Sequence, residues 1–211
     1  MKREEREGRL TRRIESFSDL VIGFSLALLA LTLGIPPHIV DLLTNPWWLV
    51  AYFWTFFLIA GLWFNHQRLF TTYFWPEPVA VVLNFVLLSM TGLLVYFVQV
   101  FVHYHDSFDR AWAFLAYWAV LGVAFLILGA LYAHGTRRRW EQLDSDERYV
   151  GVRQAARGLI LGPCALLGVA ACMLLRTRGL DDVWPTAVFV SVGVLASRLT
   201  AHLLKARVAG V

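Results

Sequence analysis

The sequence predicts an all-α, polytopic membrane protein with six transmembrane helices in a single domain, residues 1–211. Three observations predict this class. Apolar residues make up 58% of the chain and charged residues only 16%, whereas an ordinary soluble domain is about 25% charged. Tryptophan, phenylalanine and tyrosine are all plentiful, and amphipathic aromatic residues gather at bilayer interfaces. Several uncharged runs also approach the roughly 20 residues that one helical span requires.

The first span is predicted at about residues 17–35. The run from Leu20 to Ile35 carries no charge and is followed by Pro36. An uncharged run of this length is typical of a membrane helix and not of the short alternating strands of a barrel. Three polar residues, Arg13, Ser18 and Asp19, precede or open it, and polar groups at membrane depth are more often functional than incidental.

The remaining five spans follow from the same hydropathy pattern. Their expected bounds are about 46–64, 78–103, 111–134, 158–175 and 183–204. Pro46 and Pro78 open the second and third spans, at positions where a missing backbone N–H does little harm. A highly charged cytoplasmic loop, about 135–157, is expected between the fourth span and the fifth, and its composition favours part of it being helical.

The basic residues predict the orientation of these spans. Of the 19 lysines and arginines, only Arg110, Arg176 and Arg178 fall on the side opposite the N-terminus. The positive-inside rule therefore predicts that both termini are cytoplasmic, and an even number of spans agrees with this. The net charge of +4 is then explained by topology, and we expect no nucleic-acid partner.

The first span offers two distinct faces at about 100° per residue. Phe24, Leu28 and Leu31 share one narrow sector. The adjoining sector carries small residues, which let helix backbones approach closely in a membrane. These are Gly23, Ala27, Ala30 and Gly34. A ring of the bulky residues from several identical subunits would form a hydrophobic constriction. The alternative is that this stripe faces lipid or another helix.

The polar residues at the start of the first span are expected to find partners on other spans. Asp19 is six residues from Arg13, which is too far for a pair within one helix. Asn65, His66 and Asn84 lie at a similar cytoplasmic depth. A network among these groups would fix helix positions, and a proton or cation site is the alternative.

No catalytic motif is found in the sequence. There is no Gly-rich phosphate loop, His-Glu-x-x-His helix or Gly-x-Ser-x-Gly elbow. His103 and His105 lack a third ligand nearby, so no metal site is predicted. We expect neither enzymatic activity nor a cofactor.

The motif Arg13-x-x-x-Phe17-Ser18-Asp19 at the opening of the first span resembles the signature of the transmembrane protein 175 family, the potassium channels of lysosomes and bacteria. The next two spans are similar to the family in their spaced Tyr, Trp, His and Asn. Here these residues are Tyr52, Trp63, His66 and Asn84. The length of six spans resembles that of a bacterial member with one repeat.

The resemblance implies a homotetramer with a pore lined by the first span and potassium-preferring leak conduction. It implies that the hydrophobic constriction lies at Phe24, Leu28 and Leu31, which is the sector found by periodicity. It also implies a structural network that holds the pore helix. The members of this network are Arg13, Phe17, Ser18, Asp19, Trp63, His66 and Asn84.

Three positions depart from the family pattern. Phe24 stands where many members have Ile or Leu, and Ala27 stands where Thr is often found and is implicated in choosing potassium over sodium. Asn65 stands where a second His is frequent. There is also no acidic or carbonyl-loop filter, so discrimination between the two ions is expected to be modest.

The leading prediction is a potassium-preferring cation channel in a bacterial plasma membrane, whose partners are its own copies, the lipid bilayer and monovalent cations. One alternative is a secondary transporter or proton-linked carrier, which the scarcity of carboxylates at mid-membrane disfavours. Another is a non-conducting membrane scaffold whose cytoplasmic loop, around residues 141–148, binds a partner.

Overall fold

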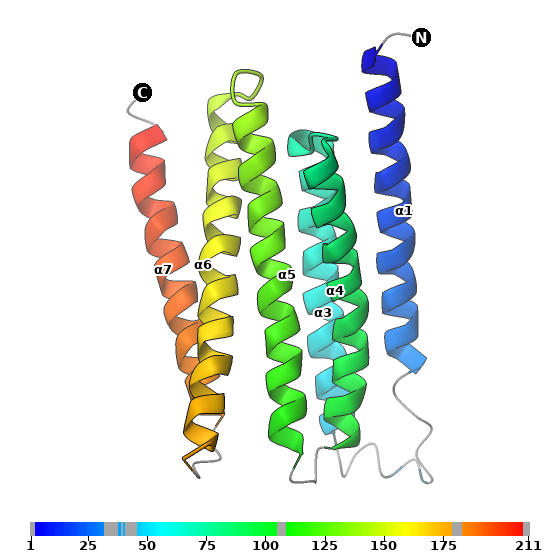
Figure 1. Cartoon of the computed structure of the whole chain (residues 1–211), viewed down its shortest axis with the longest axis vertical. Helices are drawn as coiled ribbons and strands as arrows, with labels where there is room; N and C mark the ends of the chain where they lie inside the picture. The colour runs from blue at the N-terminus through cyan, green and yellow to red at the C-terminus, as the bar shows by residue number, and fades with distance from the viewer. Residues whose placement is uncertain are drawn as a thin grey trace.

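The computed structural model describes residues 3–31, 38, 40, 46–104, 109–178 and 183–208. Within these ranges the chain is helical and contains no strand (Figure 1). The elements in order are α1 (Arg3–Leu31), α3 (Trp47–Arg68), the π-helix η1 (Leu69–Tyr73), α4 (Pro78–His103), α5 (Arg110–Arg138), α6 (Ser145–Arg176) and α7 (Trp184–Val208). Six membrane-length apolar helices are found in this part of the chain. The predicted integral, multi-pass membrane protein is therefore confirmed.

The helices lie side by side, with α1 at one edge of the bundle and α7 at the other (Figure 1). The start of α1 and the end of α7 lie at the same end of the bundle. The helix α1 packs against α3 and α4, whereas α6 packs against α5 and α7. Because α5 also packs against α4, contacts between neighbouring helices run continuously from α1 to α7.

The helices of the fourth and fifth spans are longer than hydropathy predicts, and the loop between them is correspondingly shorter. The helix α5 ends at Arg138 and α6 begins at Ser145, so most of the segment expected as a loop at about 135–157 is helical. A capping box starts α6: Asp144 Oδ1 accepts a hydrogen bond from the Glu147 backbone N–H at 2.7 Å, and the Glu147 carboxylate accepts from the Asp144 N–H at 3.1 Å. This cap satisfies backbone donors that would otherwise be unpaired.

Glycines bring the backbones of α5 and α6 into direct contact. A Cβ atom at Gly158 would lie 2.5 Å from the Cα of Gly129, and one at Gly162 would lie 2.8 Å from the carbonyl oxygen of Gly122. In a bilayer, where lipid tails are as apolar as the helix surface, such close backbone packing is a main source of helix association. The α5–α6 pair is therefore a closely packed part of the fold.

The π-helix η1 ties the C-terminal end of α3 to this pair. The Phe74 N–H donates to the Leu69 carbonyl at 2.7 Å, an i to i+5 bond that widens the last turn. Tyr73 is buried, and its hydroxyl donates to the Glu147 carbonyl of α6 at 2.8 Å. Gly135 of α5 and Gly151 of α6 leave the space that the backbone and ring of Tyr73 occupy.

Replacing Gly158 by alanine is expected to lower the thermal stability of the detergent-purified protein. The new methyl group would meet the α5 backbone, and overpacking of this kind costs about 1–3 kcal/mol. The melting temperature measures the effect. Gly92→Ala in α4 is the matched control, because a Cβ atom there meets nothing within 4 Å. Equal melting temperatures for the two variants would contradict the prediction.

Candidate pore helix and its polar anchor

One face of α1 is buried against the protomer. It consists of apolar and small hydroxyl side chains at spacings of three and four residues, which form a single stripe on a helix. These residues are Ile14, Ser18, Ile22, Ser25 and Leu29. The two serines satisfy their hydroxyls within the helix, since Ser18 donates to the Ile14 carbonyl at 2.7 Å and Ser25 to the Val21 carbonyl at 2.9 Å. The stripe therefore fixes which side of α1 faces α3 and α4.

The sector predicted to form the constriction lies on a different, uncovered side of α1. Phe24 is 62% exposed, Leu28 is 54% exposed and Leu31 is 79% exposed. Phe17 and Leu20 are also exposed and continue the same ridge toward the N-terminus. We call the five residues the apolar ridge of α1. The protomer thus leaves a line of large apolar side chains exposed, although Phe17 also contacts Phe85 of α4.

The sector of small residues is uncovered as well. Gly23, Ala27 and Ala30 are all exposed, and a Cβ atom at Gly23 would meet nothing within 4 Å. Gly34, the fourth predicted member, lies outside the described residues. The small residues therefore do not serve contacts between α1 and the other helices of the same protomer.

A buried hydrogen-bond chain connects α3, α4 and α1. His66 Nε2 donates to Asn84 Oδ1 at 2.8 Å, and Asn84 Nδ2 donates to the Ser18 hydroxyl at 3.0 Å. All three side chains are buried. The ring of His66 also stacks on that of Phe70 at a centroid distance of 4.5 Å, whereas its Nδ1 has no partner among the described residues. We call this chain the polar anchor.

Asp19 makes a second connection between α1 and α3. Its Oδ1 accepts hydrogen bonds from Trp63 Nε1, at 3.1 Å, and from Gln67 Nε2. Gln67 was not predicted as a partner, although it lies four residues after Trp63 and therefore on the same face of the helix. The two donors hold the carboxylate from successive turns of α3.

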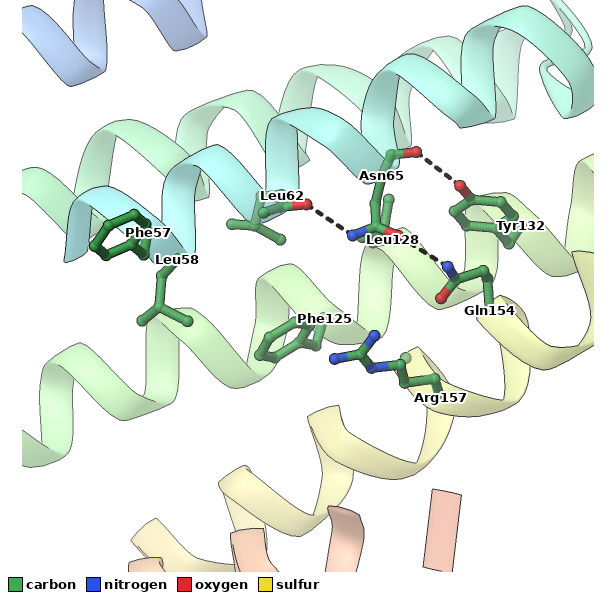
Figure 2. Close-up of a pocket in the computed structure, with 11 residues that line it drawn as sticks. Phe57, Leu58, Leu62, Asn65, Phe125, Leu128, Tyr132, Gln154 and Arg157 are labelled. Atoms are coloured by element: carbon green, nitrogen blue, oxygen red, sulfur yellow. Dashed lines mark hydrogen bonds between the residues drawn. The ribbon is translucent and has the colours of Figure 1, made fainter. Parts of the chain in front are cut away.

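The other predicted network residues take different positions. Phe17 contacts Phe85 of α4 edge to face, with ring centroids 5.8 Å apart. Arg13 is exposed and forms no hydrogen bond or ion pair with the described residues. Asn65, proposed as a partner for Asp19, instead contacts α5 and α6: its carbonyl accepts from Tyr132 and its side chain from Gln154 (Figure 2). Consecutive residues of α3, Asn65 and His66, thus contact different helices.

The described residues contain no group of three His, Cys, Asp or Glu side chains that could hold a metal ion. His103 lies at the end of α4, and His105 is outside the described ranges. The chemistry that the site offers is therefore that of an apolar surface held in place by buried hydrogen bonds.

The comparison with known proteins agrees with the motif. The family model described as endosomal/lysosomal potassium channel TMEM175 matches residues 13–95, which include most of α1, all of α3 and most of α4. The resemblance to that family is therefore confirmed over these residues. No curated protein sequence matches the chain.

Two solved structures share the fold. A lysosomal potassium-selective channel TMEM175 homolog from Chamaesiphon minutus is 20% identical, with a TM-score of 0.67 over 92% of this chain and 98% of that chain. A variant of the potassium channel MtTMEM175, crystallised with a nanobody–MBP fusion protein, is 20% identical, with a TM-score of 0.70 over 90% of this chain and 93% of that chain. The all-helical fold is thus that of these channel structures.

Replacing Asn84 by leucine is expected to destabilise the protein, because the buried groups of His66 and Ser18 would both lose a partner. Each unsatisfied buried polar group costs about 1–3 kcal/mol. Thermal unfolding in detergent measures the loss. Ser89→Ala on the same helix is the control, since Ser89 is exposed and donates only to the Phe85 carbonyl of its own helix. An Asn84→Leu melting temperature equal to that of the control would refute the role of the anchor.

Proposed function

We propose that the chain is a TMEM175-family channel subunit, and that four copies form a potassium-preferring cation pore lined by α1. The observation that carries the proposal is the asymmetry of α1. One face is held by a buried stripe and by the polar anchor, while Phe24, Leu28 and Leu31 are more than half exposed. A helix held so firmly in one rotation presents the same uncovered face in every copy.

A symmetric ring of subunits would bring the uncovered faces of α1 together around one axis. Closed rings of identical subunits are the common form of oligomer, and a ring places equivalent helices around one axis. The helix α1 stands at an edge of the bundle (Figure 1), where it can reach such an axis without rearrangement. The sector of Gly23, Ala27 and Ala30, adjoining the ridge, would let each α1 approach its neighbour closely.

The constriction would control conduction through its apolar character. Side chains of Phe24, Leu28 and Leu31 from four subunits would narrow the pore in three successive layers. A narrow apolar segment resists wetting, so an ion must shed part of its hydration shell to pass. K⁺ holds its water less tightly than the smaller Na⁺, which favours potassium. The family's potassium preference is proposed for this chain on that basis, with modest selectivity because Ala27 provides no hydroxyl.

The polar anchor would keep the constriction in place. Rotation or displacement of α1 would separate Asp19 from Trp63 and Ser18 from Asn84, and the second of these bonds is buried, where water cannot replace it. The pore radius therefore depends on contacts within each protomer as well as between protomers. With both termini cytoplasmic, as the basic residues indicate, the anchor lies toward the inner side of a bacterial plasma membrane.

Leu28→Ala is expected to raise potassium flux several-fold, because it widens the middle layer of the constriction and eases its wetting. Flux from liposomes loaded with K⁺ measures the change, and Leu195→Ala on α7, where Leu195 is 61% exposed, is the matched control. Absence of flux in both the wild type and Leu28→Ala would reject the channel. Saturable uptake coupled to a second ion would instead identify a transporter.

The mass of the assembled protein tests the ring separately. Native mass spectrometry or light scattering with detergent correction is expected to give four subunits. A monomer or dimer that still crosses the membrane would contradict a pore built from α1 and would favour a non-conducting scaffold.

Asp19→Asn is expected to reduce assembly more than it changes ion selectivity. The variant keeps one acceptor for Trp63 and Gln67 but loses the charge that strengthens both bonds, which weakens the hold on α1. The tetramer fraction in size-exclusion chromatography and the K⁺/Na⁺ reversal potential are the two measurements. A normal tetramer fraction with inverted selectivity would show that Asp19 acts on the ion directly.

A further inference from the structure

A pocket of about 210 Å³ lies between α3, α5 and α6 (Figure 2). One end is apolar and includes Phe57, Leu58 and Phe125. The other end is polar and includes Asn65, Gln154 and Arg157. The pocket is partly open to the surface of the bundle, and it is separate from the proposed pore.

Most polar groups at the polar end satisfy one another. Tyr132 Oη donates to the Asn65 carbonyl at 2.7 Å, and Gln154 Nε2 donates to Asn65 Oδ1 at 3.0 Å. Asn65 Nδ2 donates to the Gly61 carbonyl at 2.7 Å. These bonds form a rigid wall at one end of the pocket, as Figure 2 shows.

Arg157 is the exception. Its side chain lines the pocket, yet it forms no hydrogen bond or ion pair with any residue that the structure describes. A guanidinium carries five N–H donors in a planar fork that matches the oxygens of a phosphate or carboxylate. The pocket therefore offers a free, directional anion-binding group beside an ordered polar wall.

Two further arginines lie near the pocket along the same two helices, although neither of them lines it. Arg153 lies one turn before Arg157 on α6, and Arg68 lies one turn after Asn65 on α3, with its guanidinium 5.5 Å from the Phe64 ring centre. Within the described ranges, no carboxylate pairs with any of the three. The polar end of the pocket is thus flanked along α3 and α6 by arginines that no described carboxylate pairs.

The depth of these groups indicates the kind of anion. Arg157 is the last charged residue before the uncharged run of α6 that begins at Gly158. The apolar end lies further into the bilayer, since Phe57 precedes Asn65 by about 12 Å along α3 at 1.5 Å per residue. A cation at the interface above an apolar slot matches a phosphate group joined to an acyl chain.

We infer that this pocket binds an anionic phospholipid of the cytoplasmic leaflet, with its phosphate at Arg157 and one acyl chain along Phe57, Leu58 and Phe125. Gly61 gives the chain room, because a Cβ atom there would meet nothing within 4 Å. A zwitterionic lipid would offer the same acyl chain, but its own cation would lie in the field of three arginines. The three arginines therefore select for net negative charge.

Native mass spectrometry of the full chain, incubated with equal amounts of phosphatidylglycerol and phosphatidylcholine, tests this inference. The wild type is expected to retain phosphatidylglycerol preferentially. Arg157→Gln should weaken that retention by at least about tenfold, the usual effect of losing a hydrogen bond to a charged group. Arg198→Gln, the same change at an exposed arginine of α7, should leave it intact. Equal losses in both variants would overturn the site.

A second pair of variants tests the apolar slot without changing charge. Gly61→Phe should fill the pocket and displace the lipid, whereas Gly92→Phe, at a similarly open glycine of α4, should not. Retention of phosphatidylglycerol by Gly61→Phe would overturn the inference. Inorganic phosphate is the third probe: if it displaces the lipid in the wild type, the site binds a soluble anion and the lipid assignment is wrong. None of these measurements depends on ion conduction.

Discussion

The hydrogen-bond chain from His66 through Asn84 to Ser18 is the interaction on which the remaining structure depends. In a bilayer the apolar surfaces of helices gain no hydrophobic driving force toward one another, because lipid tails are equally apolar. A buried polar group does select, since no water is present to replace a lost partner. A rotation of α1 by one residue would turn Ser18 away by about 100°. The chain therefore fixes the rotation of α1 against α3 and α4.

Fixing the rotation of α1 determines which side chains are exposed on the opposite side of the helix. With Ser18 and Ile22 directed into the protomer, helical periodicity leaves Phe24, Leu28 and Leu31 uncovered. The identity of the exposed ridge is thus a consequence of polar contacts made elsewhere on the same helix. In a pore lined by α1, the orientation of the pore-lining face would already be set within each free protomer. Such pre-organisation lowers the free-energy cost of assembly.

The sequence was sufficient to predict six spans and to single out five residues that form hydrogen bonds between α1, α3 and α4, because uncharged runs and polar groups at membrane depth are rare and therefore informative. These residues are Ser18, Asp19, Trp63, His66 and Asn84. Other features depend on pairs of residues far apart in the chain. The π-helix at Leu69–Tyr73 exists beside Gly135 and Gly151, which nothing local relates to Tyr73. The composition of the charged loop indicated that part of it is helical, but its charges concealed that this part is continuous with the fifth span, although the Asp144 and Glu147 spacing of a capping box was a usable signal.

The helix α3 forms hydrogen bonds with both halves of the bundle. Its residue His66 holds α1 through Asn84, while the adjacent Asn65 accepts hydrogen bonds from Tyr132 of α5 and Gln154 of α6. Because both residues belong to one helical turn, α3 cannot rotate to improve one set of contacts without breaking the other. The rigid α5–α6 pair, closed by Gly129 and Gly158, therefore supports the position of α1 although the two are not neighbours. Any ligand that wedges α3 away from α5 and α6 acts on the same constraint that holds the proposed pore helix.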